Sequence, residues 1–244
     1  MRLKLLVGED KEYKIPWSYN YFLASSIYYL LSKYSLKFSY NIHSKGWSYK
    51  NKNFKLFSFS PLFPQKISFE KDYILMIGPL TFILSSPDSV FIEILESVLK
   101  KEGFLKLICY NLPVLKTKIF EISEIKNELK AKTLSPLVVS QSKKEGDKSF
   151  SIYLSPETEH FYHKLKEIIK NKFECFTGER LSDYDIEIMC ESYKSKLYSI
   201  KNIKVKGYMA TLNLRGNIQV LRFIMDSGLG EKTSMGFGMV EKTS

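Results

Sequence analysis

The stretch DSGLGEKTSMGFGMVE, from Asp226 to Glu241, places four glycines within eleven residues. Glycines this dense mark a backbone that turns sharply or approaches another group closely. The pattern is not a phosphate-binding P-loop, because that motif needs Gly-Lys-Ser/Thr and here Gly230 is followed by Glu231. It is not a dinucleotide fingerprint either, because Thr233 stands where the third glycine of G-x-G-x-x-G belongs.

The residues before this loop predict a helix. Ile218, Leu221 and Met225 repeat at helical spacing, and Gly228 is placed to end the helix. We therefore expect a helix, then the glycine loop, and then a short strand in MGFGMVE. The loop follows the negative end of the helix dipole, so loop amides and nearby lysines would have to hold any anion there.

The composition indicates a folded protein of one or two domains. The chain has 244 residues, of which 44% are hydrophobic and 14% aromatic, enough to build real cores. Its longest apolar stretches contain Gly and Pro and are too short to span a bilayer, and MRLKLLVGEDK is interpreted as a first strand. Three cysteines without a C-x-x-C pair argue against a disulfide frame or a zinc ribbon and fit a reducing cytoplasm.

The charge distribution points to a polyanionic partner. The formal net charge is +11 and the pI is about 9.3. No Asp or Glu occurs from Tyr13 to Phe69 or from Ser192 to Met225, although both segments carry many lysines. Lysines beside aromatic side chains suit single-stranded nucleic acid, because cations meet phosphates while rings stack on bases. The alternatives are a lysine-rich solvated surface and a basic membrane-surface protein, and no lysine-faced amphipathic helix supports the second.

The chain divides into two halves with the same order of elements. A helix at about 18–34 follows the first strand, with Leu23, Ile27, Leu30 and Leu31 on its apolar face. A second helix is expected to have Ser86 as its N-cap and Pro87 at its first position, and to end before Gly103. The second half repeats this Ser-Pro signature, with Ser155 as the N-cap of a helix and Pro156 at its first position. A basic hairpin and the helix at 217–227 follow.

Each half therefore follows the order β-α-β-β-α-β, which is the ferredoxin-like (RRM-like) order. The predicted fold class is α+β, with two tandem ferredoxin-like domains and a glycine-rich loop in the second. We place the boundary within Glu121 to Lys132, which gives domains 1–125 and 126–244.

The glycine loop, at the end of the second half of a basic chain, is similar to the terminal glycine-rich motif of a known family. The stretch GLGEKTSMGFGMV resembles that motif almost residue for residue, and IPWSYNYFLASSIYYLL, KLFSFS and TLSPLVV look like further landmarks at matching places. The chain thus resembles the RAMP superfamily of CRISPR systems, and most of all its stand-alone pre-crRNA-processing endoribonucleases, the "Cas six" family. The resemblance spans essentially the whole chain.

This resemblance implies two ferredoxin-like domains side by side, with a basic cleft between them. It also implies cleavage of CRISPR repeat RNA without a metal or other cofactor, in which the ribose 2′-OH attacks the adjacent phosphate and leaves a 2′,3′-cyclic phosphate and a 5′-OH. The implied partners are single-stranded or weakly structured repeat RNA and subunits of a CRISPR effector complex.

Two other functions stay open at this point. One is a non-catalytic RAMP-type protein that holds repeat RNA inside an effector complex, and the other is a basic ribosome-associated protein. The sequence also leaves open whether the protein is a monomer or a homodimer.

Cleavage of this kind needs a base for the 2′-OH proton, an acid for the leaving 5′-oxygen and positive charge near the phosphoryl oxygens. Histidine suits the proton transfers because its ordinary pKa is near 6.5. By the resemblance, His43 matches the catalytic histidine of the family and Tyr28 matches the tyrosine on its helix. Among the lysines, Lys55 is the best match to the catalytic lysine of the family. The predicted catalytic residues are therefore His43, Tyr28 and Lys55.

Two features of this set remain open. The segment from His43 to Lys55 is longer than the family's pattern, so Lys45, Lys50 or Lys52 could take the role of the lysine. A free tyrosine is a poor base at neutral pH. The tyrosine would need neighbouring lysines to lower its pKa, or its hydroxyl would mainly orient the 2′-OH.

His160 and His163 lie one helical turn apart and invite a metal site. No nearby cysteine or flanking carboxylate pattern completes a ligand set, so we interpret them as exposed helix residues. The absence of paired carboxylates in the basic segments argues against two-metal nuclease chemistry.

The glycine loop has two interpretations. Residues without a Cβ let RNA lie directly against main-chain amides; alternatively, the loop packs against the first domain and joins the halves. The predicted RNA-binding residues are Lys45, Lys50, Lys52, Lys201, Lys204, Lys206, Arg215, Gly228, Gly230, Lys232, Thr233, Ser234, Gly236 and Gly238.

Overall fold

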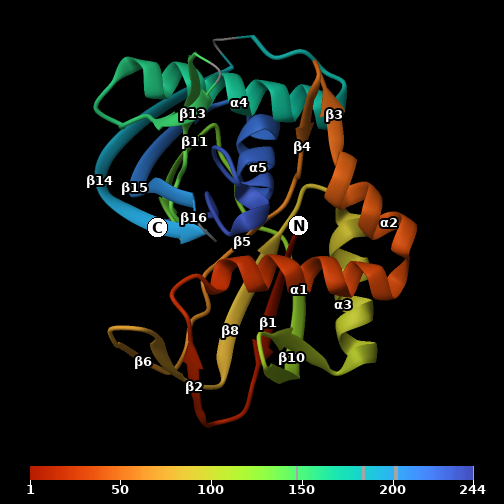
Figure 1. Cartoon of the computed structure of the whole chain (residues 1–244). Helices are drawn as coiled ribbons and strands as arrows, with labels where there is room; N and C mark the ends of the chain where they lie inside the picture. Colours follow the sequence, from red (N-terminus) through yellow and green to blue (C-terminus); the bar gives the residue numbers. More distant parts are fainter. Residues whose placement is uncertain (147, 183–184, 201–202, 244) are drawn as a thin grey trace.

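The computed structural model describes residues 1–146, 148–182, 185–200 and 203–243. Two units are stacked, with most of the first half of the chain below and the second half above, while the hairpin of residues 47–54 reaches up beside the second half (Figure 1). Helix α4 (Glu159–Thr177) lies along the top of the upper unit, and α1 (Tyr19–Tyr34) lies across the upper part of the lower unit. The N-terminus lies near the middle of the molecule, where the two units meet.

The first half is built on a five-stranded antiparallel sheet. Helices α1 and α3 (Ser89–Glu102) share one buried core with this sheet. The strands are, in spatial order, β5 (Ser58–Phe59), β8 (Leu80–Ser85), β1 (Arg2–Val7), β10 (Tyr110–Phe120) and β9 (Phe104–Leu107).

The second half is built on a four-stranded antiparallel sheet. Helices α4 and α5 (Ile218–Ser227) pack on it around a second core. None of the helices in the described residues is long and apolar enough to cross a membrane. The strands are, in spatial order, β14 (Ile186–Ile200), β15 (Ile203–Gly216), β11 (Glu128–Thr133) and β16 (Val240–Lys242).

Both sheets repeat one order of elements along the chain. In each half, a strand, a helix, two strands, a helix and a strand follow one another. In each sheet, the second, third, first and fourth of these strands lie side by side, with β9 added at the edge of the first sheet. The predicted α+β class is therefore confirmed.

Smaller elements are added to these two sheets and their helices. A three-stranded sheet has the order β2 (Glu12–Ile15), β7 (Ile74–Ile77) and β6 (Lys66–Phe69). The connection from α1 to β5 contains α2 (Leu36–Tyr40), a π-helical turn η1 (Asn41–Lys45) and a hairpin of β3 (Trp47–Tyr49) and β4 (Lys52–Phe54). The second half adds a hairpin of β12 (Ser140–Glu145) and β13 (Lys148–Tyr153), and a 3-10 turn η2 (Thr233–Met235) in the glycine loop.

The predicted N-caps of two helices are wrong. Helix α3 is capped by Asp88, whose carboxylate accepts the N–H groups of Val90 and Phe91, while the hydroxyl of Ser86 donates to Leu56 O at 2.7 Å. Helix α4 is capped by Thr158 rather than Ser155. In both cases a better-placed oxygen two or three residues after the serine accepts the free N–H groups.

The segment predicted to hold the domain boundary, Glu121 to Lys132, overlaps a central strand. Residues Glu128–Thr133 form β11, which pairs with both β15 and β16. Its side chains alternate between exposed and buried, and the buried ones include Leu129, Ala131 and Thr133. Alternate charged residues made this segment resemble a linker. The coil of residues 121–127 precedes it, and a domain boundary there stays a prediction.

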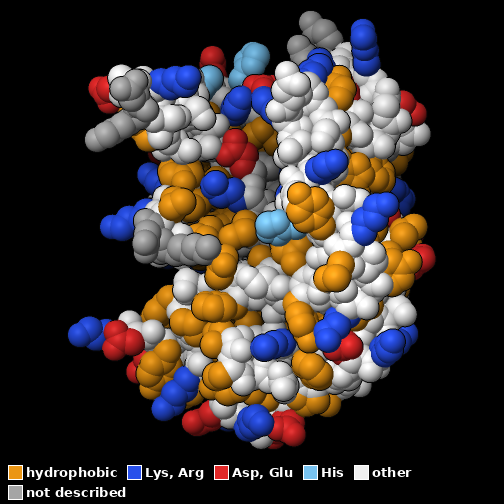
Figure 2. All heavy atoms as spheres, turned by 45° about the vertical axis from the view of Figure 1, so that its right-hand side comes forward, with side chains coloured by type: hydrophobic (Ala, Val, Ile, Leu, Met, Phe, Trp, Pro, Cys, Tyr) orange, Lys and Arg blue, Asp and Glu red, His pale blue; other side chains and the backbone are white. Residues whose placement is uncertain are grey.

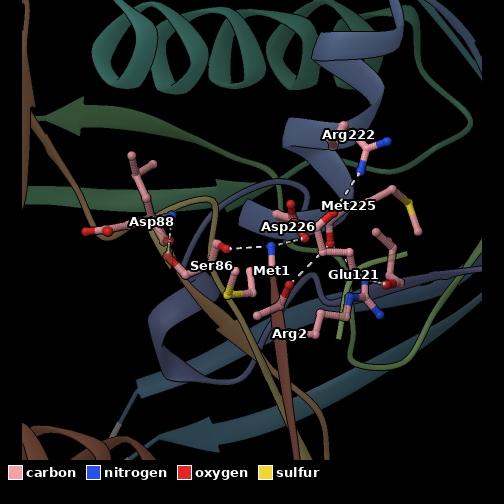
Figure 3. Close-up of polar contacts among 11 residues, drawn as sticks. Met1, Arg2, Ser86, Asp88, Glu121, Arg222, Met225 and Asp226 are labelled. Carbon is pink, nitrogen blue, oxygen red and sulfur yellow. Dashed lines mark hydrogen bonds and ion pairs between the residues drawn. The ribbon is translucent and has the colours of Figure 1, made fainter. Parts of the chain in front are cut away.

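Arg2, at the start of β1, ties the two units together (Figure 3). Its guanidinium donates to Met225 O at 2.7 Å and to Val240 O at 2.5 Å, and the residue is only 3% exposed. The terminal amine of Met1 lies 2.8 Å from a carboxylate oxygen of Asp226. Burial lowers the pKa of Arg2 to about 10, against the opposing effect of Asp226. The first strand of one unit is therefore anchored in the last elements of the other.

Candidate functional site

Helix α1 holds Tyr28 where the two units meet. Leu23, Ile27 and Leu31 on the predicted apolar face are fully buried, whereas Tyr28 is half-buried. Burial raises the pKa of Tyr28 to about 12, although a hydrogen bond with Ser234 opposes this shift. The hydroxyl therefore stays protonated at neutral pH, which suits a hydrogen-bonding role better than that of a base.

His43 lies on the π-helical turn that follows α2. Ile42 is buried and anchors this turn, while the neighbouring His43 is exposed. The ring of His43 meets the ring of Tyr28 edge to face, with centroids 4.7 Å apart. Single π-helical turns occur often at functional sites, and here the turn presents an imidazole to solvent beside a tyrosine.

Gly46 closes this turn and brings it against β4. Its φ is +58°, and a Cβ there would lie 2.2 Å from the carbonyl oxygen of Phe54. The same Cβ would lie 3.1 Å from Cδ of Lys55, so the stem of Lys55 passes close to the turn that carries His43. Burial lowers the pKa of Lys55. Because an ammonium with a lowered pKa is a stronger acid, Lys55 is suited to donate a proton as well as to supply charge.

The glycine loop connects the three predicted catalytic residues. The hydroxyl of Thr233 donates to Lys55 O at 3.2 Å, and Ser234 hydrogen-bonds with Tyr28. Tyr28 in turn contacts His43. The structure therefore brings His43, Tyr28 and Lys55 to one neighbourhood, on the side of the molecule that holds the loop.

The loop itself is largely buried against both units. A Cβ at Gly228 would lie 2.9 Å from Ser58, and one at Gly236 would lie 2.6 Å from the ring of Phe59. The side-chain amide of Asn20 donates to Gly236 O at 3.4 Å. The loop therefore packs against the first half, as one of the two interpretations expected, and contact of its amides with RNA stays a prediction.

We expect Gly238→Ala to destabilise the protein by about 3 kcal/mol, because the new Cβ adds a steric clash to the strain of a positive φ. The φ of Gly238 is +66°, and a Cβ there would lie 1.8 Å from Leu229 O. Gly103 is the matched control, since its φ is +75° but a Cβ would meet nothing within 4 Å. Urea unfolding should show a loss of only about 1 kcal/mol for Gly103→Ala. Equal losses for the two variants would mean that the packing of the loop is not tight.

A basic cavity of about 680 Å³ opens beside Lys55. It lies between β4, α4, the β12 strand and the glycine loop, and Glu231 is the one carboxylate among the described residues that line it. Figure 2 shows this side of the molecule as hollowed, with Lys and Arg side chains around the hollow. The lysines that line the cavity are Lys52, Lys55, Lys164, Lys172 and Lys232.

Two of the predicted RNA-binding lysines form ion pairs between the units. Lys50 lies 3.4 Å from Glu174, and Lys52 lies 3.0 Å from Glu167, both on α4. Lys45 is exposed on the π-helical turn. Lys52 and Glu167 are both exposed, and because such a pair contributes little energy, Lys52 can exchange its carboxylate for a phosphate. The partner of Lys50, Glu174, is buried. Contact of these lysines with RNA stays a prediction.

The remaining predicted RNA contacts are spread along β15. Lys204 and Lys206 are exposed near one end of the strand, and Lys206 lies over the ring of Tyr208. Arg215 is exposed near the other end, roughly 30 Å away at about 3.3 Å per residue. The structure does not bring Arg215 close to Lys204 and Lys206. Lys201 lies outside the described residues.

His160 and His163 are exposed on α4, as expected. The Nε2 atom of His160 lies 2.8 Å from Oε1 of Gln141 on the neighbouring hairpin. Within the described ranges, no group of three or more His, Cys, Asp or Glu side chains is arranged to hold a metal ion.

Sequence reasoning missed two buried cations that shape this region, Arg2 and Lys172. Lys172 is 5% exposed and donates to Gly230 O at 2.8 Å. It also missed Glu174, which is buried and accepts the hydroxyl of Tyr49 at 2.6 Å. The only available signal for Lys172 was its place among the apolar residues of its helix.

Two family models together cover most of the chain. The model "CRISPR-associated protein Cas6, N-terminal" matches residues 14–119, and "CRISPR associated protein Cas6, C-terminal" matches residues 116–242. The chain belongs to the Cas6 family of CRISPR-associated RAMP proteins.

Full-length relatives agree with this assignment. The "CRISPR-associated endoribonuclease Cas6 1" of Methanocaldococcus jannaschii is 31% identical and is aligned over 98% of this chain and 92% of its own length. A Pyrococcus furiosus relative, named "Putative CRISPR-associated endoribonuclease-like protein Cas6", is 27% identical over 99% of this chain and 97% of its own.

Solved structures of similar proteins share the whole fold of this Cas6 family member. One, from a study of a Cas6-related gene of Pyrococcus furiosus, has a TM-score of 0.86 and 26% identity, and covers 100% of this chain and 98% of its own. Another, described as "CRISPR associated protein Cas6", has a TM-score of 0.82 and 30% identity over 100% of this chain and 99% of its own.

Proposed function

We propose that this Cas6 family member is an endoribonuclease that cleaves CRISPR repeat RNA, without a metal ion, and so matures pre-crRNA to crRNA. The observation that carries the proposal is the contact between the exposed ring of His43 and the ring of Tyr28, beside the partly buried Lys55. This set supplies the base, the acid and the positive charge that cleavage of a phosphodiester by its own 2′-OH needs, with His43 as the base and Lys55 as both acid and cation. Tyr28 adds a neutral hydrogen-bond donor.

In this mechanism His43 accepts the proton of the ribose 2′-OH. The 2′-oxygen forms a bond to phosphorus, and the bond from phosphorus to the 5′-oxygen breaks. Lys55 donates a proton to the leaving 5′-oxygen, for which its lowered pKa is favourable. The hydroxyl of Tyr28, protonated because burial raises its pKa, orients the 2′-OH or a phosphoryl oxygen. The products are a 2′,3′-cyclic phosphate and a 5′-OH.

Lys55 is the lysine best placed for this role. Lys50 and Lys52 lie in ion pairs with glutamates of α4. Among the described residues Lys55 forms no ion pair, its stem passes the turn that carries His43, and its carbonyl is held by Thr233. These contacts favour Lys55 over the neighbouring lysines.

The cleft between the units supports repeat RNA as the partner. We infer that both halves are ferredoxin-like domains, because each has the β-α-β-β-α-β order, and that they divide near residue 125. Four lysines of the basic cavity, Lys52, Lys55, Lys164 and Lys232, line it where the two domains meet, and their charges suit an RNA backbone.

A second candidate function is a RAMP protein that holds repeat RNA without cutting it. It is favoured by the names of two relatives, from Pyrococcus furiosus and Pyrococcus horikoshii, which are called "endoribonuclease-like" and match this chain at 27% and 25% identity.

One experiment separates these functions. The purified protein is incubated in EDTA with CRISPR repeat RNA of its source organism, and with a scrambled RNA of equal composition. We expect a single cut within the repeat and none in the scrambled RNA. Binding of the repeat without a cut would support the second function, and equal binding of both RNAs would contradict both.

A further inference from the structure

Lys172 is a buried lysine that the proposed chemistry does not use. It lies on α4 and is 5% exposed, and its Nζ donates to the carbonyl oxygen of Gly230 at 2.8 Å. Lysines are almost never this buried unless they are paired, and burial of an ammonium carries a large desolvation cost. Because the burial of its ammonium is so unfavourable, Lys172 is a candidate for a role other than stability.

The contact with Gly230 fixes the first part of the glycine loop. On the opposite side, the N–H of Glu231 donates to Val138 O at 2.8 Å. The carboxylate of Glu231 accepts the hydroxyl of Ser140 at 2.6 Å. The peptide between Gly230 and Glu231 is therefore clamped between α4 and the segment that leads into β12.

The next residues of the loop reach the proposed catalytic groups. Thr233 holds the carbonyl of Lys55, and Ser234 hydrogen-bonds with Tyr28, whose ring contacts His43. Only two residues separate Gly230 from Thr233. A displacement of the Gly230 carbonyl would therefore be transmitted directly to these contacts.

We propose that Lys172 is a positioning residue, which holds the Gly230 carbonyl and thereby places Thr233 and Ser234 so that Lys55 and Tyr28 are oriented for cleavage. The inference rests on the proposed function of that site. A positioning role differs from a purely structural role in one respect: loss of Lys172 should impair the cleavage step more than folding or RNA affinity.

The experiment compares Lys172→Met, Ser234→Ala and the double variant with the wild type. Cleavage rates are measured with protein in excess, and affinity is measured with repeat RNA that carries one 2′-deoxyribose at the cut. Lys166→Met is the control, because it removes a positive charge from the same helix. We expect each single variant to lose about tenfold in rate, with affinity changed less than about twofold.

The double variant gives the decisive number. If Lys172 acts through Ser234, the double variant should be about as slow as the slower single variant, rather than about a hundredfold slower, because coupled residues are not additive. A hundredfold loss, or a loss of affinity that equals the loss of rate, would overturn the proposal. So would a full rate for Lys172→Met, or a Lys166→Met variant that is equally slow.

The pH dependence of the free energy of unfolding tests whether the substitution acts by removing the buried ammonium. Burial lowers the pKa of Lys172 from 10.5 to about 7, against the opposing charge of Glu231. Between these values the unfolded chain binds more protons than the folded one, so the stability of the wild type should rise with pH from 7 to 8.5. Lys172→Met should lack this rise. The charged side chains that face the same cavity are Glu231, Lys52, Lys55, Lys164 and Lys232.

An NMR readout keeps the test independent of cleavage. The chain has three histidines, so the ring signals of His43 can be assigned with a His43→Ala variant. Lys172→Met and Ser234→Ala should both shift these signals, because Tyr28 lies against the ring, whereas Lys166→Met should not.

If the wild type does not cut RNA, the proposed function fails, and this shift of the His43 signals alone decides whether Lys172 has the positioning role. If Lys172→Met does not fold, Lys172→Gln replaces it, and a failure of both to fold would contradict the proposal.

Discussion

His43→Ala should lower the rate of repeat-RNA cleavage about 10²–10⁴-fold, the usual contribution of a positioned acid or base. The side chain is exposed, and the turn that carries it is anchored by the buried Ile42, so the fold should persist. RNA affinity should change little, because the lysines around the cavity remain. Rates with protein in excess, together with affinity for uncleavable RNA, measure the two effects separately.

The other two histidines are matched controls. His160 and His163 are exposed on α4 and have no role in the proposed mechanism, so the same substitution at either should leave the rate within about twofold. If His43→Ala cuts as fast as the wild type, the site is assigned to the wrong residue. If all three variants are equally slow, the loss is not specific to His43.

Arg2→Ala should destabilise the protein by about 3–5 kcal/mol, because it removes two charge-assisted hydrogen bonds to buried carbonyls. Those carbonyls belong to Met225 and Val240 in the second half. The substitution also empties the space of a side chain that is 3% exposed. Urea unfolding monitored by fluorescence and circular dichroism measures the loss.

Arg222 provides the control for this prediction and lies in the same region of Figure 3. Its guanidinium is 3.8 Å from Glu121, and both side chains are largely exposed. Arg222→Ala should cost less than about 1 kcal/mol. A similar loss of stability for both variants would show that the contacts of Arg2 do not hold the two units together.

The fold was predictable where local patterns agree with tertiary packing. The apolar face of α1, the helix before the glycine loop and the ends of α3 and α5 at Gly103 and Gly228 all follow from spacing and glycine. The strand β11 was not predictable, because Leu129 is the one large apolar residue on its buried face, beside the smaller Ala131 and Thr133. The caps at Asp88 and Thr158 were missed because the preceding Ser-Pro pairs gave an equally good local signal.

The site was predictable in its residues but not in its geometry. The resemblance pointed to His43, Tyr28 and Lys55, but no local pattern shows that a π-helical turn brings His43 onto Tyr28. Only one signal, its place among the apolar residues of its helix, pointed to the burial of Lys172. It is buried because it meets a carbonyl 58 residues away in the sequence, a contact that only the packed structure reveals.

The most direct test of the proposed chemistry is the identity of the RNA ends after cleavage in EDTA. Mass spectrometry should find a 2′,3′-cyclic phosphate on the upstream fragment and a 5′-OH on the downstream fragment. A repeat RNA with a single 2′-deoxyribose at the cut should stay intact while it remains bound. Cleavage of that deoxy-substituted RNA, or cleavage only after Mg²⁺ is added, would contradict attack by the 2′-OH at His43, Tyr28 and Lys55.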